Sequence, residues 1–310
     1  MQRAITYYAA FLSLVATFVL FGSFERTTRP DAQSATVSSA TSDPGALPQV
    51  IRSVDLSKEY TFAGEVVPQG NFDAMERLDR ELSVNSYWHS STLLNIKQAH
   101  RYFPVIEPIL AEHGVPDDFK YLAVAESNLR NAVSYAGAKG VWQFLKSTGQ
   151  AYGLEINGEV DERYHLEKST EAACRYLKDY YRQFGSWTLA AAAYNMGGPR
   201  LKRLLQEQQA ESYYELNLNE ETSRYVFRIL AFKEILTSPE KFGFYVDESE
   251  LYEPLKYRTV MVNTTVESWA DFAQEHGTNY RMLKVYNPWL ISGRLTCSGK
   301  KDYIIKLPPA

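Results

Sequence analysis

Apolar residues recur at helical spacing over most of the chain that follows residue 72. The first such run, after Phe72, contains Met75, Leu78, Leu82 and Val84. The pattern resumes after Ser90 and Ser91, which are typical helix-capping residues, and continues through RYFPVIEPIL at 101–110. Further helical runs occupy 141–153, 167–184, 190–198 and 221–236. The pattern therefore predicts a mainly α-helical protein over this region.

A short helix is predicted in the middle of the chain. Its start is marked by Pro116, Asp117 and Asp118, because proline suits the first turn and acids complement the positive end of the helix dipole. Four residues share one face of this helix: Phe119, Leu122, Ala123 and Glu126. Burial of Glu126 would disfavour its charged form, and a glutamic acid that stays protonated near neutral pH can act as a general acid. Spacing alone, however, favours the alternative of a half-buried glutamate paired with a basic residue.

The pattern changes after about residue 257. A β-branched strand at 258–262 is followed by helical runs at 267–277 and 279–288, and a second strand occupies 302–308. The C-terminal part is therefore predicted to be a small β-α-α-β domain.

The N-terminal part is different in character. Residues 4–24 carry no charge, and this length spans a bilayer as a helix. A cleaved signal peptide is the alternative, but the small-residue cleavage pattern near Gly22 and Ser23 is poor. Residues 25–50 are rich in Ser, Thr, Ala, Asp and Pro, which is typical of a flexible linker. We expect an uncleaved anchor, with the remaining chain outside the cytoplasm.

Composition excludes some classes of function. A net charge of −4 gives no basic surface for nucleic acid, and no Gly-rich loop for phosphate is present. The five histidines are scattered, and no His, Cys and acid cluster has metal-ligand spacing, so we expect neither metal nor cofactor. The two cysteines, Cys174 and Cys297, are expected to be unpaired thiols. Aromatic residues make up 14% of the chain, which suits sugar binding, although most of them are expected in the core.

Three separate motifs carry a resemblance to a known family. AES at 125–127, AVSYAGAKGVWQF at 132–144 and AYNMGG at 193–198 resemble the soluble-type lytic transglycosylases, lysozyme-like enzymes that cleave bacterial peptidoglycan. The resemblance extends from about residue 82 to 226 and is strongest to the membrane-bound type D branch. It implies a lysozyme-like helical domain over 72–245, in which Glu126 is the single catalytic acid and base. The chain departs from the family pattern in two places. The interval from the ES pair at 126–127 to the AG pair at 136–137 is one residue shorter than usual, and Tyr135 stands where a proline is common.

The same resemblance implies a set of substrate-binding residues. It places Gln143 and Ser134 in the sugar cleft, and Tyr194 beside the acid, where its hydroxyl orients the carboxyl group or binds substrate. The remaining matches to cleft positions are Asn195, Glu221 and Tyr225. Local alternatives stay open for several of them: GAKGVWQ as a plain glycine turn, Asn195 as part of a helix C-cap, and Glu221 as a helix N-terminal acid. Trp142 is more simply a core residue.

A second resemblance covers residues 257–308. The β-α-α-β order, NPWL at 287–290 and the terminal YIIKLP resemble the LysM module, a glycan-binding domain. The usual Gly-Asp turn after its first strand is replaced by Asn-Thr-Thr at 263–265. The resemblance implies glycan binding, and a degenerate module kept for packing is the alternative.

Many glycosidases require a second catalytic carboxylate. The candidates near the site in the sequence are Asp161, Glu162, Glu167 and Glu171. Each has a local explanation, and Glu167 and Glu171 are expected to face solvent in the first turns of a helix. We therefore expect a mechanism with one carboxylate.

The resemblance implies cleavage of the β-1,4 bond between N-acetylmuramic acid and N-acetylglucosamine, with 1,6-anhydro products. The expected partners are glycan strands and, through residues 4–24, the inner membrane; the expected location is the periplasmic side of a bacterial cell envelope. The alternatives are a hydrolytic muramidase of lysozyme type and a non-catalytic peptidoglycan-binding scaffold. Nothing in the sequence indicates the oligomeric state.

Overall fold

The computed structural model describes residues 52–297 and 301–309. The chain divides into two units, Met1–Ile51 and Arg52–Ala310. The expected anchor at 4–24 and linker at 25–50 therefore lie outside the described residues. Within the described ranges, no helix combines the length and the apolar character needed to cross a bilayer.

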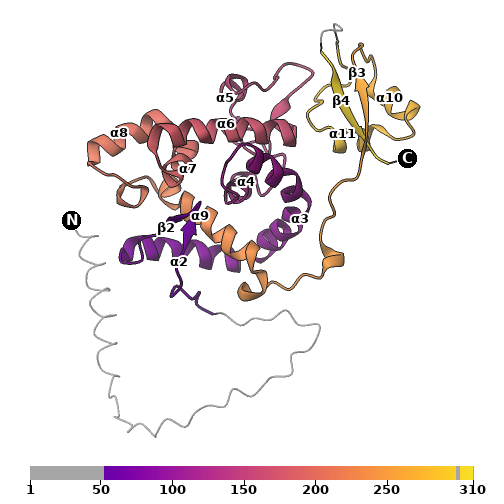
Figure 1. The fold of residues 1–310 in the computed structure, drawn as a ribbon. Helices are drawn as coiled ribbons and strands as arrows, with labels where there is room; N and C mark the ends of the chain where they lie inside the picture. The colour runs from indigo at the N-terminus through magenta and orange to yellow at the C-terminus, as the bar shows by residue number, and fades with distance from the viewer. Residues whose placement is uncertain (1–51, 298–300, 310) are drawn as a thin grey trace, which may run out of the picture. The chain divides into compact units, whose positions relative to one another are not determined.

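Helices make up the larger domain, as the hydrophobic pattern predicts (Figure 1). The α-helices are α2 Phe72–Tyr87, α3 His89–Glu112, α4 Phe119–Ser127, α5 Lys146–Ala151, α6 Leu166–Phe184, α7 Trp187–Met196, α8 Gly198–Gln208 and α9 Glu220–Thr237. Short 3₁₀ turns η1 Glu162–Tyr164, η2 Tyr213–Glu215, η3 Pro239–Phe242 and η4 Glu248–Glu250 lie between or after them. Figure 1 shows α4 enclosed by α3, α6, α7 and α9. Residues Phe119–Val124 are all buried, so α4 is the central helix of this domain.

A small hairpin packs against the start of α4. It consists of β1 Thr61–Phe62 and β2 Glu65–Val66, and its Phe62 ring lies 5.1 Å from the ring of Phe119. Asp118 accepts hydrogen bonds from the backbone N–H of Ala63 at 2.6 Å and from Lys233 Nζ at 2.8 Å. Asp118 makes no side-chain cap to α4. Asp118 therefore joins the hairpin and α9 to the start of α4. The preceding acid, Asp117, pairs with Lys120.

Some local expectations are wrong. The helix predicted over 141–153 is shortened to α5, because Gly140 and Gln143 have φ values of +83° and +49°, which a helix cannot accommodate. Ser90 and Ser91 do not cap α3, which begins at His89 after Trp88. Val84 lies on the outer face of α2, because that helix buries Leu78, Leu82 and the polar residues beside them.

The C-terminal domain has the predicted β-α-α-β order. Strands β3 Arg258–Val262 and β4 Tyr303–Leu307 pair antiparallel, with Val260 opposite Ile305. Between them lie α10 Trp269–Glu275 and α11 Tyr280–Tyr286. Trp269, Leu283 and Leu307 are fully buried in its core, and Val160 of the helical domain belongs to the same buried cluster. The fold is therefore mainly α, with a small strand-helix domain at the C-terminal end.

Candidate active site

Glu126 lies in the last turn of α4, at the centre of the helical domain. The helix ends directly after it because Asn128 and Leu129 adopt left-handed conformations, with φ values of +52° and +54°. Ser127 Oγ donates to the carbonyl oxygen of Val141 at 2.8 Å, so the helix end is bonded to the loop that precedes α5. The site therefore combines a helix end with residues 131–144, which we call the active-site loop.

The carboxyl group of Glu126 is half-buried and has one direct side-chain partner, Tyr225, whose hydroxyl donates to Oε1. Burial raises the pKa of Glu126 from 4.5 to about 7, because the charged form loses solvation. The hydrogen bond from Tyr225 and the charge of Arg228 lower this pKa, whereas the charge of Glu221 raises it. Glu126 therefore holds its proton in a range suited to general acid catalysis.

One face of α9 points to this carboxyl group. Glu221, Tyr225 and Arg228 are spaced by four and three residues, which places them together along the helix. Tyr225 is buried, and the loss of solvation together with the nearby Glu126 charge raises its pKa well above the ordinary value. Its hydroxyl therefore remains a hydrogen-bond donor at any physiological pH. Glu221 is exposed at the start of α9 and acts on Glu126 through its charge.

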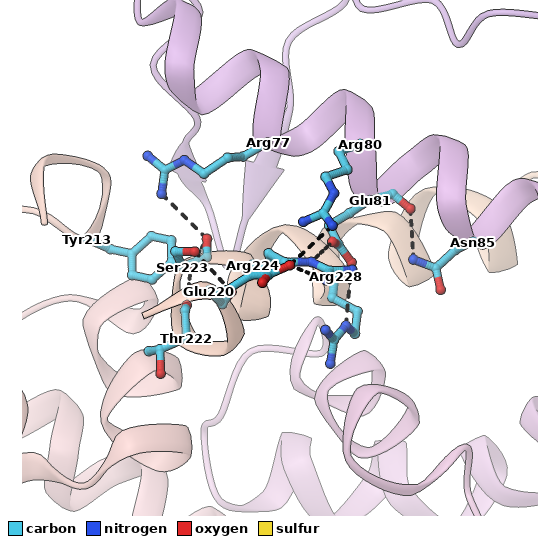
Figure 2. Close-up of polar contacts among 10 residues, drawn as sticks. All are labelled: Arg77, Arg80, Glu81, Asn85, Tyr213, Glu220, Thr222, Ser223, Arg224 and Arg228. Atoms are coloured by element: carbon cyan, nitrogen blue, oxygen red, sulfur yellow. Dashed lines mark hydrogen bonds and ion pairs between the residues drawn. The ribbon is translucent and has the colours of Figure 1, made fainter. Parts of the chain in front are cut away.

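Arg228 belongs to a buried ion-pair network that lies between α2 and α9 (Figure 2). Glu81 is fully buried; it accepts a hydrogen bond from Arg224 Nε, and one from Arg228 Nε at 3.4 Å. Glu220 joins the network at its outer edge, pairing with Arg80 at 3.2 Å. Because Glu81 binds both guanidinium groups, it restricts where the charge of Arg228 can lie. The sequence carried a signal for this residue, since Glu81 interrupts the apolar stripe formed by Leu78 and Leu82.

The active-site loop folds back on itself. Val133 pairs with Lys139, and Lys139 with Phe144, in isolated antiparallel bridges. Gln143 Nε2 donates to the carbonyl oxygens of Ala132 at 3.1 Å and Gly140 at 2.7 Å. The amide group of Gln143 therefore stabilises the loop itself.

Ser134 lies at the exposed end of the same loop. Its Oγ accepts a hydrogen bond from the N–H of Ala138 at 3.0 Å, which closes the turn. Tyr135 beside it is fully exposed. Ser134 is thus accessible, whereas Gln143 is partly enclosed.

Tyr194 and Asn195 lie in the last turn of α7, and Tyr194 is near enough to Glu126 for its charge to be felt. The hydroxyl of Tyr194 donates to the carbonyl oxygen of Trp142 at 2.7 Å, and the Glu126 charge contributes to a raised Tyr194 pKa. Asn195 Oδ1 accepts from Thr222 Oγ1 at 2.9 Å, which joins α7 to α9. The tyrosine that contacts the acid is therefore Tyr225, while Tyr194 holds the active-site loop. Trp142 is fully buried, as expected for a core residue, and its Nε1 donates to Thr170 at 2.8 Å.

The other acids considered from the sequence all have basic partners. Asp161 pairs with Arg163 at 2.7 Å, Glu162 with Lys168, and Glu171 with Arg175 at 3.9 Å. Glu167 does not face solvent as expected, because it pairs with Lys306 of the C-terminal domain. Cys174 and Cys297 are both free thiols. Across residues 52–297 and 301–309, no group of three or more His, Cys, Asp or Glu side chains is placed to hold a metal ion.

Two known families match parts of the chain. Residues 104–217 match the Transglycosylase SLT domain, and residues 258–310 match the Soluble lytic transglycosylase C-terminal LysM-like domain. Residues 104–217 are therefore similar to a transglycosylase SLT domain, and residues 258–310 to a LysM-like domain.

The chain is also similar to individual curated proteins. Over 255 residues the chain is 29% identical to the membrane-bound lytic murein transglycosylase D of Escherichia coli K12, covering 79% of this chain and 55% of the relative. A putative tributyltin chloride resistance protein of Alteromonas sp. is 26% identical over 121 residues, covering 38% of this chain and 58% of the relative. The chain thus spans little more than half the length of these curated relatives.

Two solved structures were also matched. The 70 kDa soluble lytic transglycosylase of E. coli has a TM-score of 0.39 and 20% identity, covering 49% of this chain and 27% of the other. An inactive mutant of the lytic transglycosylase Slt of Pseudomonas aeruginosa has a TM-score of 0.41 and 21% identity, covering 59% and 31%.

Proposed function

We propose that this protein is a peptidoglycan lytic transglycosylase that cleaves the β-1,4 bond between N-acetylmuramic acid and N-acetylglucosamine. The observation that carries the proposal is Glu126 in an SLT domain, half-buried, bonded to Tyr225, and with a pKa of about 7. The catalytic domain extends over 72–245 and the LysM-like domain over 257–308. The glycan strand is the common substrate class of both domains.

In the first step, protonated Glu126 gives its proton to the glycosidic oxygen as the bond from the anomeric carbon to that oxygen breaks. The positive charge that develops at the anomeric carbon is stabilised by the N-acetyl group of the substrate. Tyr225 donates a hydrogen bond to the carboxylate that forms, which lowers the free energy of this state.

In the second step, the Glu126 carboxylate accepts the proton of the muramyl 6-hydroxyl as that oxygen bonds to the anomeric carbon. The products are a 1,6-anhydromuramyl end and a free 4-hydroxyl on the departing sugar, and no water is consumed. Glu126 is protonated again at the end of the cycle. The basic partners of Asp161, Glu162, Glu167 and Glu171 support a mechanism with one carboxylate.

The substrate-binding residues form two groups in this proposal. Ser134 and Gln143 present the active-site loop to the sugars, and Tyr194 and Asn195 support that loop and the start of α9. Glu221 and Tyr225 line the α9 side of the acid.

The protein acts on the periplasmic side of a bacterial cell envelope, held at the inner membrane by residues 4–24. The support is the uncharged character of this segment and the membrane-bound name of the E. coli relative. Separation of inner-membrane and soluble fractions tests the location: recovery of the full-length chain in the soluble periplasmic fraction would contradict the anchor.

The decisive experiment compares the native protein with Glu126→Gln on purified peptidoglycan sacculi. We expect the variant to lose clearing of turbidity, because an amide cannot donate the proton. The matched control is Glu171→Gln, a carboxylate on the surface of α6 that should be dispensable.

Mass spectrometry of the soluble products separates the alternatives. Anhydromuramyl ends support transglycosylation, whereas reducing ends identify a hydrolytic muramidase. Equal clearing by the native protein and Glu126→Gln would remove Glu126 from the catalytic role, and no clearing by either would favour a binding scaffold.

A further inference from the structure

We propose that the C-terminal domain holds the active-site loop in its working position, and that Arg163 is the positioning residue that connects the two. The connection runs through residues 155–163, which we call the docking segment. The activity readouts below rest on the proposed function, whereas the hydrogen-exchange readout does not depend on it.

The C-terminal domain is joined to the docking segment by backbone hydrogen bonds. Val160 forms a β-bridge with Leu290, and the N–H of Asp161 donates to the carbonyl oxygen of Trp289 at 2.9 Å. The N–H of Ile291 donates to the carbonyl oxygen of Glu159 at 3.0 Å. Val160 is fully buried among the core residues of the C-terminal domain. The docking segment is therefore part of that domain's core as well as part of the helical domain.

Charged side chains extend this contact. Glu159 accepts a hydrogen bond from the N–H of Thr296 at 2.6 Å, and Glu155 pairs with Lys301. Tyr303 donates to Glu155 at 3.1 Å. Each of these contacts links residues more than 130 positions apart, so they hold the C-terminal domain in one place on the docking segment.

The docking segment in turn binds the active-site loop through Arg163. Its guanidinium group binds Asp161 with two hydrogen bonds, from Nε at 2.8 Å and from Nη2 at 2.7 Å. The remaining terminal nitrogen, Nη1, donates to the carbonyl oxygens of Gly137 and Phe144, each at 3.2 Å. All three nitrogens of this buried side chain are therefore used, two for Asp161 and one for the loop. Lysine cannot reproduce this fork.

Two further contacts join the active-site loop to the docking segment. Lys139 Nζ lies 3.5 Å from the Asp161 carboxylate. Gly140 lies so close to Arg163 that a Cβ atom there would be 1.9 Å from the Arg163 carbonyl oxygen. The loop and the docking segment are thus in direct backbone contact, and a displacement of one must displace the other.

Two carbonyl groups of the loop are bonded to residues beside the acid. That of Val141 accepts from Ser127, the neighbour of Glu126, and that of Trp142 accepts from Tyr194. Asn131 and Val141 also share a cavity of about 130 Å³ with Trp289 and Lys306 of the C-terminal domain. Arg163 makes no contact with the reacting carboxyl group, so its effect on catalysis is positional.

The first test perturbs the C-terminal side of the contact in the full chain. Leu290→Ala removes a buried side chain that faces Val160, and Leu283→Ala removes an equally buried one in the same core, on α11. Hydrogen exchange followed by mass spectrometry reports on the loop. We expect Leu290→Ala to raise exchange of the 131–144 amides at least about tenfold relative to Leu283→Ala, as local opening becomes easier.

The second test uses Arg163→Gln and Arg163→Lys, assayed well below their unfolding temperatures. Misplacement of a catalytic group by a remote change lowers rates by up to about 100-fold, so we expect kcat of Arg163→Gln to fall about 10- to 100-fold. KM should change by less than about twofold, because the loss lies in positioning of the acid. Arg163→Lys should recover part of kcat, since it keeps the pair with Asp161.

Unchanged loop exchange in Leu290→Ala, together with faster exchange of its β3 and β4 amides, would overturn the proposal. So would native kcat in folded Arg163→Gln. If the native protein shows no activity at all, the proposed function fails while the exchange comparison still decides whether the two domains are coupled. Equal loop exchange in both leucine variants would show a general loss of stability and would also contradict the proposal.

Discussion

The raised pKa of Glu126 has a measurable cost in stability. In the unfolded chain this carboxyl group titrates near 4.5, and in the folded protein near 7. Between these values the folded state binds more protons than the unfolded state, so the free energy of unfolding falls as the pH rises. Above about pH 7 the full loss in the free energy of unfolding is present, and below pH 4.5 this loss is absent. The difference corresponds to about 3 kcal/mol, at about 1.4 kcal/mol per pH unit.

Glu126→Gln removes this cost because the amide is neutral at every pH. We therefore expect the variant to be more stable than the native protein by up to about 3 kcal/mol at pH 8, and nearly equal to it at pH 4. For a chain of this size the gain corresponds to a rise in Tm of roughly 5–10 °C. The proposed function requires the same variant to be inactive, so the proposed catalytic group is one whose removal stabilises the fold.

Calorimetric scans of both proteins between pH 4 and pH 8 measure this difference directly. Glu171→Gln is the control, since its exposed carboxylate should give no pH-dependent gain. A stability difference that is the same at pH 4 and pH 8 would refute the reasoning. It would mean that the Glu126 carboxylate is as well solvated in the folded protein as in the unfolded chain.

Three further results are expected from the contacts around the site. Tyr225→Phe removes the hydrogen bond that favours the charged form of Glu126, so the pKa of Glu126 should rise and the alkaline limb of the kcat profile should move up by about one pH unit. An unchanged alkaline limb would contradict the role of that bond. Glu81→Ala leaves two arginines without their buried partner and should cost about 3 kcal/mol by urea unfolding, whereas exposed Glu76→Ala should cost less than about 0.5 kcal/mol. Gly140→Ala should abolish activity and lower Tm far more than Gly137→Ala does. Both glycines have positive φ, but only Gly140 lacks space for a Cβ atom. Equal losses of Tm in the two variants would disprove the steric argument.

Helical periodicity was sufficient to locate the central helix and to show that Glu126 ends its apolar face. The same kind of reasoning located both strands and both helices of the C-terminal domain. These features depend on neighbours within one or two turns, which the order of residues specifies directly. Phe119, Leu122 and Ala123 are buried as the spacing predicts, although the residues between and after them, Lys120, Tyr121 and Val124, are buried as well.

Features that depend on contacts distant in the chain were predicted only in part. The expected helix over 141–153 forms only at Lys146–Ala151, since the loop before it packs at Gly140 directly against the backbone of Arg163. Asp118 lies at the start of α4 as expected, but the sequence did not show that it also binds Ala63 and Lys233, which are distant in the chain. Local propensity is a weak preference, and tertiary contacts override it.

The spacing of residues along the chain specified its helical class and the order of elements in its C-terminal domain, whereas the family resemblance, and not spacing, singled out Glu126 as the expected acid. Packing alone determined the partners of that acid, since Tyr225 reaches Glu126 from 99 residues away and Glu81 reaches Arg228 from 147. Packing also determined that Arg163 joins the C-terminal domain to the active-site loop. The physical reason is that a pKa depends on solvation and charge within a few ångströms, and only the folded chain brings those groups together.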